Sequence, residues 1–319
     1  MSIKDKLIKH RIVIAISVIA ILLVAMVCGI FAYQSRDYKV KLYLDHAEIV
    51  RYIGKESDVV IPDRLWGKRV TVIGDSVFEK NRRVKSVSIS DNVEEIGQYA
   101  FYSCSNLENV ICGKNVKRVC MGAFEYCDKL KNVSLNEGLI EIQSCAFVST
   151  EELKTIEIPS SVESIKGKAF WGSGLESIVF KGDKTYVKRT ALTVTPWCKN
   201  QEGYVICGDS VLIAYNGDEE VLNIPSGVKH LCFSVNENVK EVYIPDTVTT
   251  IYDEDDSLFT NDMVIYMPAN DIEIYYGVRT KEYVKDVNIV TTAGSYAEQI
   301  AKEHGMKCTI VDEIVYPEN

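Results

Sequence analysis

A single period of 23 residues dominates the centre of the chain. An apolar residue followed by phenylalanine recurs at this spacing, at Val77-Phe78, Ala100-Phe101, Ala123-Phe124, Ala146-Phe147 and Ala169-Phe170. A fixed period in the twenties is typical of a solenoid, whose units cannot bury their apolar faces alone and therefore stack into one continuous core. The period predicts an array of short stacked coils rather than a globular domain.

Each repeat contains two apolar segments and a turn. The first segments open at Val87, Val110, Val133, Ile156 and Ile178. Because side chains alternate between the two faces of a strand, we expect every second residue of these segments to face the core. A second apolar wall follows at positions such as Val93 and Ile96, and the Ala-Phe pair then fills the turn.

A column of small or polar residues stands three positions after each phenylalanine, at Asn81, Cys104, Cys127, Thr150 and Ser173. All five can hydrogen-bond or pack against the backbone at the bend, where buried peptide groups need partners. Metal binding by Cys104 and Cys127 is the alternative, but adjacent coils supply one thiol each and no histidine joins them. We expect a structural column and no metal.

A longer duplication relates residues 47–63 to residues 210–226 at an offset of 163. Each copy is predicted to be a β-hairpin that turns at Gly54 or Gly217 and leads into a run of coils. The predicted segments are repeats with an N-terminal hairpin cap (47–180), an irregular segment with the second hairpin (181–221), and further repeats (222–294).

Residues 295–319 are predicted to cap the C-terminal end of the array. Ser295 and Glu298 have the spacing of a capping box at the start of a helix. Gly305 is a natural end for that helix, and a strand is expected at 307–311. The apolar stripe of the helix would consist of Ala297, Ile300 and Ala301.

The N-terminal region predicts a membrane anchor. Residues 12–33 contain 22 positions without a charge, and as a helix they would extend about 33 Å, enough for a hydrocarbon core of about 30 Å. Residues 1–11 are basic and are predicted to be cytoplasmic, which places the repeats outside the cell. Residues 34–46 are then a tether. The alternatives are a cleaved signal peptide or a lipoprotein cysteine at Cys28, but the run is long and the residue next to Cys28, Val27, is not small.

Composition argues against several kinds of partner and site. The net charge is −9, and the acidic residues are dispersed without a basic face, so nucleic acid is not an expected partner. Nine cysteines lie outside the apolar N-terminal segment, with no C-x-x-C pair. An odd number of dispersed cysteines disfavours a disulfide scaffold, and we expect buried free thiols that behave as small apolar residues.

No catalytic motif is recognisable, and we expect a non-enzyme without cofactors. Cys198 or Cys207 could pair with His230 as nucleophile and base, but no neighbouring residue suggests a lowered thiol pKa. The acidic run at 253–256 could bind calcium, but it lacks the glycine and ligand spacing of an EF-hand loop. An enzyme built on the irregular segment is the least favoured class.

The pattern IEIPSSVESIKGKAF, which begins at Ile156, resembles the BspA-type leucine-rich repeats of bacterial surface proteins. Their unit is close to L-x-x-I-x-I-P-x-x-V-x-x-I-G-x-x-A-F-x-x-C-x-x-L. Ile96-Gly97 matches its I-G step, Pro159 its proline and Cys104 its cysteine. The resemblance covers residues 45–312 and weakens after residue 180. It implies an α/β repeat solenoid of the leucine-rich type, rich in β-structure. Together with the residues discussed above, the expected chain has one N-terminal transmembrane helix, this solenoid and a short C-terminal capping helix.

The resemblance also implies a role at the cell surface, because the family is associated with attachment. We expect a single-pass protein of the cell membrane, anchored through residues 12–33, whose extracellular repeats bind proteins of a host or a neighbouring cell in adhesion. A structural or sensory ectodomain without an external partner is the alternative.

The outward positions of the repeat strands are the predicted ligand-binding surface. They are small, polar and nearly uncharged, and they contain no row of aromatic residues, which favours protein recognition over sugar stacking. The predicted binding residues are Ser86, Ser88, Asn109, Asn132, Ser134, Thr155, Glu157 and Ser177. Ile111 and Val179 occupy equivalent positions and are expected either on this surface or in the core.

Overall fold

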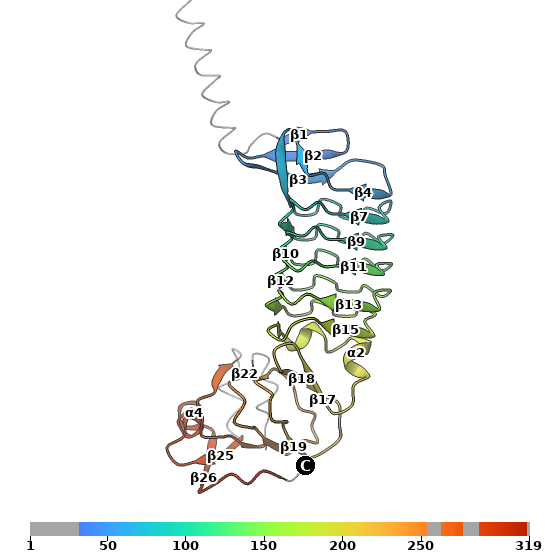
Figure 1. Ribbon diagram of the computed structural model, residues 1–319. Helices are drawn as coiled ribbons and strands as arrows, with labels where there is room; N and C mark the ends of the chain where they lie inside the picture. The colour runs from blue at the N-terminus through green and yellow to red at the C-terminus, as the bar shows by residue number, and fades with distance from the viewer. Residues whose placement is uncertain (1–31, 254–262, 277–286, 318–319) are drawn as a thin grey trace, which may run out of the picture. The chain divides into compact units, whose positions relative to one another are not determined.

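The computed structural model describes residues 32–253, 263–276 and 287–317 (Figure 1). The chain forms two compact units, unit 1 up to Leu153 and unit 2 from Lys154 onward. Each unit is built mainly from short strands that stack coil upon coil, as the repeat predicts. The helices in the described residues are short, and strands and turns make up the rest, so the solenoid is β-rich as expected and the α/β class overstates its helical part.

Unit 1 has two sheets that form two walls of each coil. In the first sheet, parallel strands stack as successive rungs in Figure 1: β4 (Asp58–Val60), β7 (Ser86–Ser88), β9 (Asn109–Ile111) and β11 (Asn132–Ser134). The second sheet contains β3 (His46–Tyr52), β6 (Lys68–Ile73), β8 (Glu95–Ile96), β10 (Arg118–Val119) and β12 (Glu141–Ile142). Val87 pairs with Val110, and Ile96 pairs with Val119, so neighbouring strands are offset by one repeat.

The third wall of unit 1, here called the turn wall, consists of residues 75–80, 98–103, 121–126 and 144–149. It contains no strand, yet its backbone is hydrogen-bonded between coils: the N–H of Phe78 donates to Ala100 and that of Phe101 donates to Ala123, at 2.7 and 2.8 Å. The phenylalanine rings stack behind it, with the centroids of Phe101 and Phe124 5.1 Å apart. Both rings are fully buried. The predicted phenylalanine column is therefore the spine of the core.

Two columns of left-handed backbone flank the Ala-Phe pairs, which the repeat pattern did not predict. In unit 1 the residues with positive φ in these columns are Ser76, Tyr99, Gly122 and Cys145 before the pair, and Lys80, Ser103, Tyr126 and Ser149 after it. Left-handed backbone costs a residue with a Cβ about 1–2 kcal/mol. The regular bonding between coils compensates for this cost, because each strained turn aligns the next one.

The polar column after the phenylalanines supplies partners to the backbone, except at Ser173, whose buried hydroxyl has no hydrogen-bond partner within the described residues. The thiol of Cys104 donates to the carbonyl oxygen of Phe78 over 3.0 Å, and that of Cys127 donates to the carbonyl of Phe101 over 3.1 Å. Thr150 donates to the carbonyl of Phe147 in its own coil. Each thiol therefore satisfies a buried carbonyl of the preceding coil.

The predicted tether at 34–46 is wrong. It contains β2 (Tyr38–Leu42), which pairs in antiparallel fashion with both β1 (Ala32–Gln34) and β3. These strands extend the second sheet and cover its N-terminal edge, and β5 (Arg64–Leu65) pairs with β6. The alternation of apolar side chains in β2 explains the pairing, because Tyr38 and Val40 are buried.

The predicted hairpin at Gly54 is also wrong. Strand β3 lies in the second sheet and β4 lies in the first, so the turn at Gly54 carries the chain from one wall to the next. Ile49 and Val59, on either side of this turn, are both buried in the core of the coil. The apolar pattern is therefore satisfied by stacking on the next coil and not by a hairpin partner.

Unit 2 begins with two parallel pairs of strands. β13 (Thr155–Ile158) pairs with β15 (Ser177–Phe180), and β14 (Ser164–Ile165) pairs with β16 (Tyr186–Val187). The second wall of the coil thus continues beyond residue 180, where the irregular segment was predicted to begin. That segment also contains η1 (Arg189–Ala191) and α2 (Pro196–Lys199).

The rest of unit 2 has two five-stranded sheets. The first comprises β17 (Tyr204–Cys207), β18 (Val211–Tyr215), β20 (His230–Leu231), β22 (Thr250–Asp253) and β24 (Glu273–Tyr276). The second comprises β19 (Val221–Asn223), β21 (Glu241–Tyr243), β23 (Val264–Tyr266), β25 (Asn288–Thr292) and β26 (Lys307–Val311). The predicted hairpin at Gly217 is wrong for the same reason as the first, since β18 and β19 lie in different sheets. The antiparallel pair is β17 with β18.

The C-terminal helix is confirmed as α4 (Tyr296–His304). The Ser295 hydroxyl accepts a hydrogen bond from the backbone N–H of Glu298 over 3.1 Å, and Gly305 ends the helix in the left-handed conformation. The predicted apolar stripe is buried, and the strand predicted after it is β26.

No helix within the described residues is long and apolar enough to cross a membrane. Residues 12–31 of the predicted anchor lie outside the described residues. Its last two positions were assigned wrongly, because Ala32 and Tyr33 belong to β1 and pair with Lys41 and Val40 of β2.

Candidate functional site

The candidate site in unit 1 is the outward surface of the first sheet, here called the strand face. Two in-register rows of side chains cross it. Row 1 contains Asp58, Ser86, Asn109 and Asn132, and row 2 contains Val60, Ser88, Ile111 and Ser134. Neighbouring strands lie about 4.8 Å apart, so each row is a close-packed line of side chains. The structure brings five of the predicted binding residues together here.

Row 1 is held together by hydrogen bonds between its own side chains. The Ser86 hydroxyl donates to a carboxylate oxygen of Asp58 over 2.5 Å, and the Asn132 amide donates to the Asn109 side-chain oxygen over 2.7 Å. Hydrogen bonds from Ser86 and then Ser57 lower the pKa of Asp58 below its ordinary value. These polar groups are therefore pre-oriented, and part of their bonding capacity is already satisfied.

Row 2 alternates large apolar and small polar side chains. Val60 is 70% exposed and Ile111 is 56% exposed, while Ser88 stands between them. Ile111 was expected either on this face or in the core, and the structure places it outside because Val110 beside it takes the inward position. The side chains of Val60 and Ile111 therefore project from the row, with the smaller Ser88 side chain between them.

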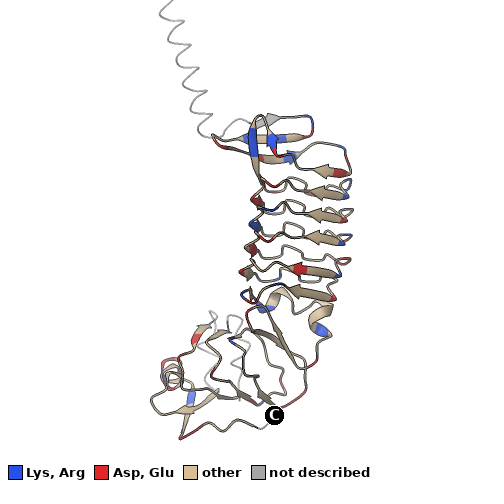
Figure 2. Cartoon of the chain, in the orientation of Figure 1, with Lys and Arg blue, Asp and Glu red and all other residues tan. Residues whose placement is uncertain are grey.

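The strand face carries little charge compared with the second sheet of unit 1. In Figure 2 the arrows of β7, β9 and β11 are almost entirely tan, whereas the second sheet alternates acidic and basic strands. On that sheet Glu95 pairs with Arg118, and Glu94 pairs with Lys117 at 3.3 Å. The charges of the second sheet thus pair one coil with the next, whereas the two rows of the strand face contain one charged residue, Asp58.

The remaining predicted binding residues belong to unit 2. Thr155 and Glu157 lie on β13, and Ser177 lies on β15 opposite Thr155. All three are exposed, as is Val179, which was left open between surface and core. Glu157 forms an ion pair with Lys181 at 3.1 Å, so this pair of strands carries charge on its outward side.

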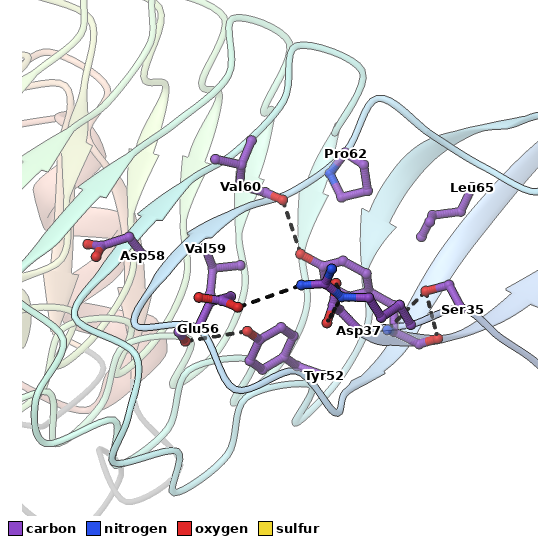
Figure 3. Close-up of a pocket in the computed structure, with 11 residues that line it drawn as sticks. Ser35, Asp37, Tyr52, Glu56, Asp58, Val59, Val60, Pro62 and Leu65 are labelled. Atoms are coloured by element: carbon purple, nitrogen blue, oxygen red, sulfur yellow. Dashed lines mark hydrogen bonds and ion pairs between the residues drawn. The ribbon is translucent and has the colours of Figure 1, made fainter.

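A pocket of about 380 Å³ lies beside the first strand of the strand face (Figure 3). Asp58, Val59 and Val60 of β4 form one side, and the turn at 35–37 between β1 and β2 forms another. Figure 3 shows Asp37, Glu56 and Tyr52 gathered near one another, with Asp58 set apart. Val60 belongs both to row 2 and to the pocket, so the two features are continuous.

The polar groups of this pocket are largely paired with one another. The guanidinium of Arg36 lies 3.3 Å from the carboxylate of Asp37 and 3.6 Å from that of Glu56. The Tyr38 hydroxyl donates to the carbonyl oxygen of Val60 over 3.1 Å, and burial raises the pKa of this phenol above its ordinary value. A ligand in this pocket would have to displace these contacts. The contacts instead hold β4 and Val60 in place.

This pocket was not predictable from the repeat, because the side formed by residues 35–38 belongs to the segment assigned as a tether. The one available signal was the apolar alternation of Tyr38, Val40 and Leu42, which predicts a strand.

The catalytic and metal alternatives gain no support from the geometry. Burial raises the pKa of the Cys198 thiol to about 11 and that of Cys207 still further, which opposes a nucleophilic thiolate. Among the described residues no group of three or more His, Cys, Asp or Glu side chains is placed to hold a metal ion. In the acidic run Asp253 is buried, and residues 254–256 lie outside the described residues.

Comparison with known proteins agrees with the repeat pattern. Residues 71–195 match the family described as "BspA type Leucine rich repeat region", in 6 copies. No curated protein matches the sequence. Two similar solved structures are a leucine-rich repeat protein from Bacteroides ovatus (18% identity over 88% of this chain and 77% of that chain, TM-score 0.48) and a leucine rich cell surface protein from Faecalibacterium prausnitzii (21% identity, 85% and 97%, TM-score 0.43). Residues 71–195 are therefore a region of BspA-type leucine-rich repeats.

Proposed function

We propose that this chain is a non-enzymatic module displayed on the cell surface, which binds another protein through the strand face of unit 1. The observation that carries the proposal is row 2, where the exposed apolar side chains Val60 and Ile111 project from a regular, rigid sheet. Exposed apolar side chains on a rigid scaffold are where a partner gains most from burial.

The energetics of the two rows support protein recognition. Fully burying an isoleucine side chain contributes about 1.5–3 kcal/mol, so covering the exposed half of Ile111 contributes about 1 kcal/mol. Row 1 already bonds Ser86 to Asp58 and Asn132 to Asn109, which lowers the cost of desolvating those groups. Because Asp58 is the one charged residue in the two rows, we expect an affinity that changes little with ionic strength.

The proposal includes display outside the cell through an N-terminal anchor. Its support is the uncharged run, of which twenty residues (12–31) remain before β1. As a helix they would extend about 30 Å, which still matches the hydrocarbon core. The alternative, a structural or sensory ectodomain without an external partner, predicts no binding to foreign proteins.

A pair of matched substitutions tests the binding surface. Ile111 and Ile140 are both exposed isoleucines of unit 1, 56% and 40%, but Ile140 lies outside the strand face. The parent chain, Ile111→Asp and Ile140→Asp are compared for binding to an array of purified extracellular proteins. We expect Ile111→Asp to weaken binding by about tenfold or more, as for a central apolar contact, and Ile140→Asp to leave it unchanged. Equal binding by all three, or no bound protein on the array, would contradict the proposal.

A further inference from the structure

The turn wall of unit 1 carries a cluster of tyrosines that the strand face does not use. The rings of Tyr99 and Tyr102 meet edge to face, with centroids 5.7 Å apart and an angle of 84°. Tyr102 and Tyr126 meet in the same way at 5.6 Å and 87°. Tyr126 is 42% exposed, and no hydrogen bond of the three phenol groups is seen within the described residues. The cluster is thus a set of aromatic surfaces with phenol groups available to a ligand.

The cluster depends on the repeat geometry beneath it. Tyr99 and Tyr126 both occupy the left-handed columns, with φ of 55° and 58°. Gly122 occupies the same column one coil after Tyr99, and a Cβ there would lie only 2.4 Å from the Tyr99 ring. The missing side chain at Gly122 therefore lets the Tyr99 ring lie across the next coil.

A hollow of about 430 Å³ opens beside these rings, lined by Ser76, Glu79, Lys80, Tyr99, Tyr102 and Glu125. Its volume falls within the range of about 300–1,000 Å³ that is usual for small-molecule sites. The ammonium of Lys80 lies 2.9 Å from the carboxylate of Glu79 and 5.9 Å from the centroid of the Tyr102 ring. Three sides of the hollow thus offer a hydroxyl, an ion pair and aromatic rings.

Glu125 distinguishes this hollow from the pocket beside β4. Its carboxylate is partly buried and has neither an ion pair nor a hydrogen bond within the part of the chain that the structure describes. Burial raises the pKa of Glu125 above its ordinary value. A partly buried carboxylate gains from any ligand that donates hydrogen bonds to it.

The charges around the hollow disfavour an anion. Lys80 and Glu79 offset each other as an ion pair, Glu125 adds one more carboxylate, and the lining offers hydrogen-bond donors and acceptors side by side. A ring bearing several hydroxyls satisfies both kinds of group, and its C–H face can pack against an aromatic ring. We propose that the hollow binds a neutral sugar unit of a glycan, with Glu125 accepting hydrogen bonds from its hydroxyls and the tyrosine cluster packing against it.

The test uses three oligosaccharide probes with the full-length chain in detergent. They are N-acetylglucosamine oligomers within a set of neutral glycans, the deacetylated cationic glucosamine oligomers, and sulfated heparin fragments. Immobilised probes are compared for binding of the parent chain, Glu125→Gln and Tyr126→Ala. Glu94→Gln is the matched control, because Glu94 is an exposed carboxylate that precedes β8, outside the turn wall, and pairs with Lys117. Thermal unfolding of each variant checks that the fold is retained.

We expect the parent chain to bind a neutral glycan in preference to both charged probes. Loss of the carboxylate contact in Glu125→Gln should weaken binding by about tenfold or more, Tyr126→Ala should weaken it as well, and Glu94→Gln should bind like the parent. Ile111→Asp should also bind like the parent, because it alters a different wall. Failure of every neutral glycan to bind at millimolar concentration, preference for a charged probe, or full affinity in Glu125→Gln would overturn the proposal.

Discussion

Removing one ring from the phenylalanine spine should destabilise unit 1 strongly. Phe124 is fully buried, and its ring stacks on that of Phe101 at 5.1 Å and on that of Phe147 at 5.2 Å. A buried Phe→Ala substitution costs about 3–5 kcal/mol, and each aromatic contact contributes about 0.5–1.5 kcal/mol beyond burial. Because Phe124 has two such contacts, the Phe124→Ala variant should fall in the upper half of the range, at about 4–5 kcal/mol.

Urea unfolding followed by circular dichroism measures this loss. Ile111→Ala is the matched control, because it also removes a large apolar side chain from unit 1, but from a position that is 56% exposed. That substitution should change the free energy of unfolding by no more than about 0.5 kcal/mol. If Phe124→Ala unfolds within about 1 kcal/mol of the parent chain, the stacked rings do not hold the coils together and the packing described above is wrong.

Two further predictions concern the turn wall. Gly122→Ala should destabilise the chain by about 1–2 kcal/mol, because φ is 63° there and the new Cβ would meet the Tyr99 ring. Ser103→Gly, in the column after the Ala-Phe pair, should be neutral or slightly stabilising. A lower melting temperature for Ser103→Gly than for Gly122→Ala would contradict the left-handed conformation of these columns. Burial raises the pKa of Cys104 to about 12 from an ordinary value of 9.0, so its contribution to stability is complete below about pH 9 and is lost as pH rises toward 12. Stability measured between pH 9 and 11 should therefore fall less steeply in Cys104→Ala than in the parent, and equal slopes would contradict this assignment.

The repeat could be predicted from the sequence because each column of the structure recurs at one spacing. Phe101 and Phe124 occupy the same environment one coil apart, and Cys104 and Cys127 make equivalent hydrogen bonds to backbone carbonyl groups. The helix at Ser295 was predictable for a different reason, since its capping residues are local. Such features can be predicted because their contacts join residues that are close in sequence or separated by one repeat.

The hairpin predictions were wrong because the same sequence pattern is compatible with two local structures. A glycine between two apolar segments is typical of a hairpin, but at Gly54 it joins two walls of one coil. The choice between the two depends on partners in the next coil, which the segment itself does not reveal. The left-handed columns could not be recognised either. Gly122 is the one glycine among their residues in unit 1, and serine or tyrosine occupies positions such as Ser103 and Tyr126.

The candidate site was predicted in part for similar reasons. The alternation of side chains in the strands was enough to place Ser86, Asn109 and Asn132 on the outward side. The pocket beside β4 was not predictable in this way, since its walls join residues 35–38 with residues 58–62 through pairing outside the repeat. The tyrosine hollow combines residues of three successive coils, and only the stacked structure brings them together.

The side of the membrane on which the repeats lie decides whether any external partner can reach the strand face. Intact cells that produce the full chain are treated with protease, and the fragments are detected with antibodies against unit 1 and against the N-terminal residues. We predict that protease removes the repeats from intact cells and leaves a small membrane-bound stub. If the repeats resist protease until the cells are lysed, while the purified chain is readily cut, the array faces the cytoplasm and the proposed binding of external proteins is wrong.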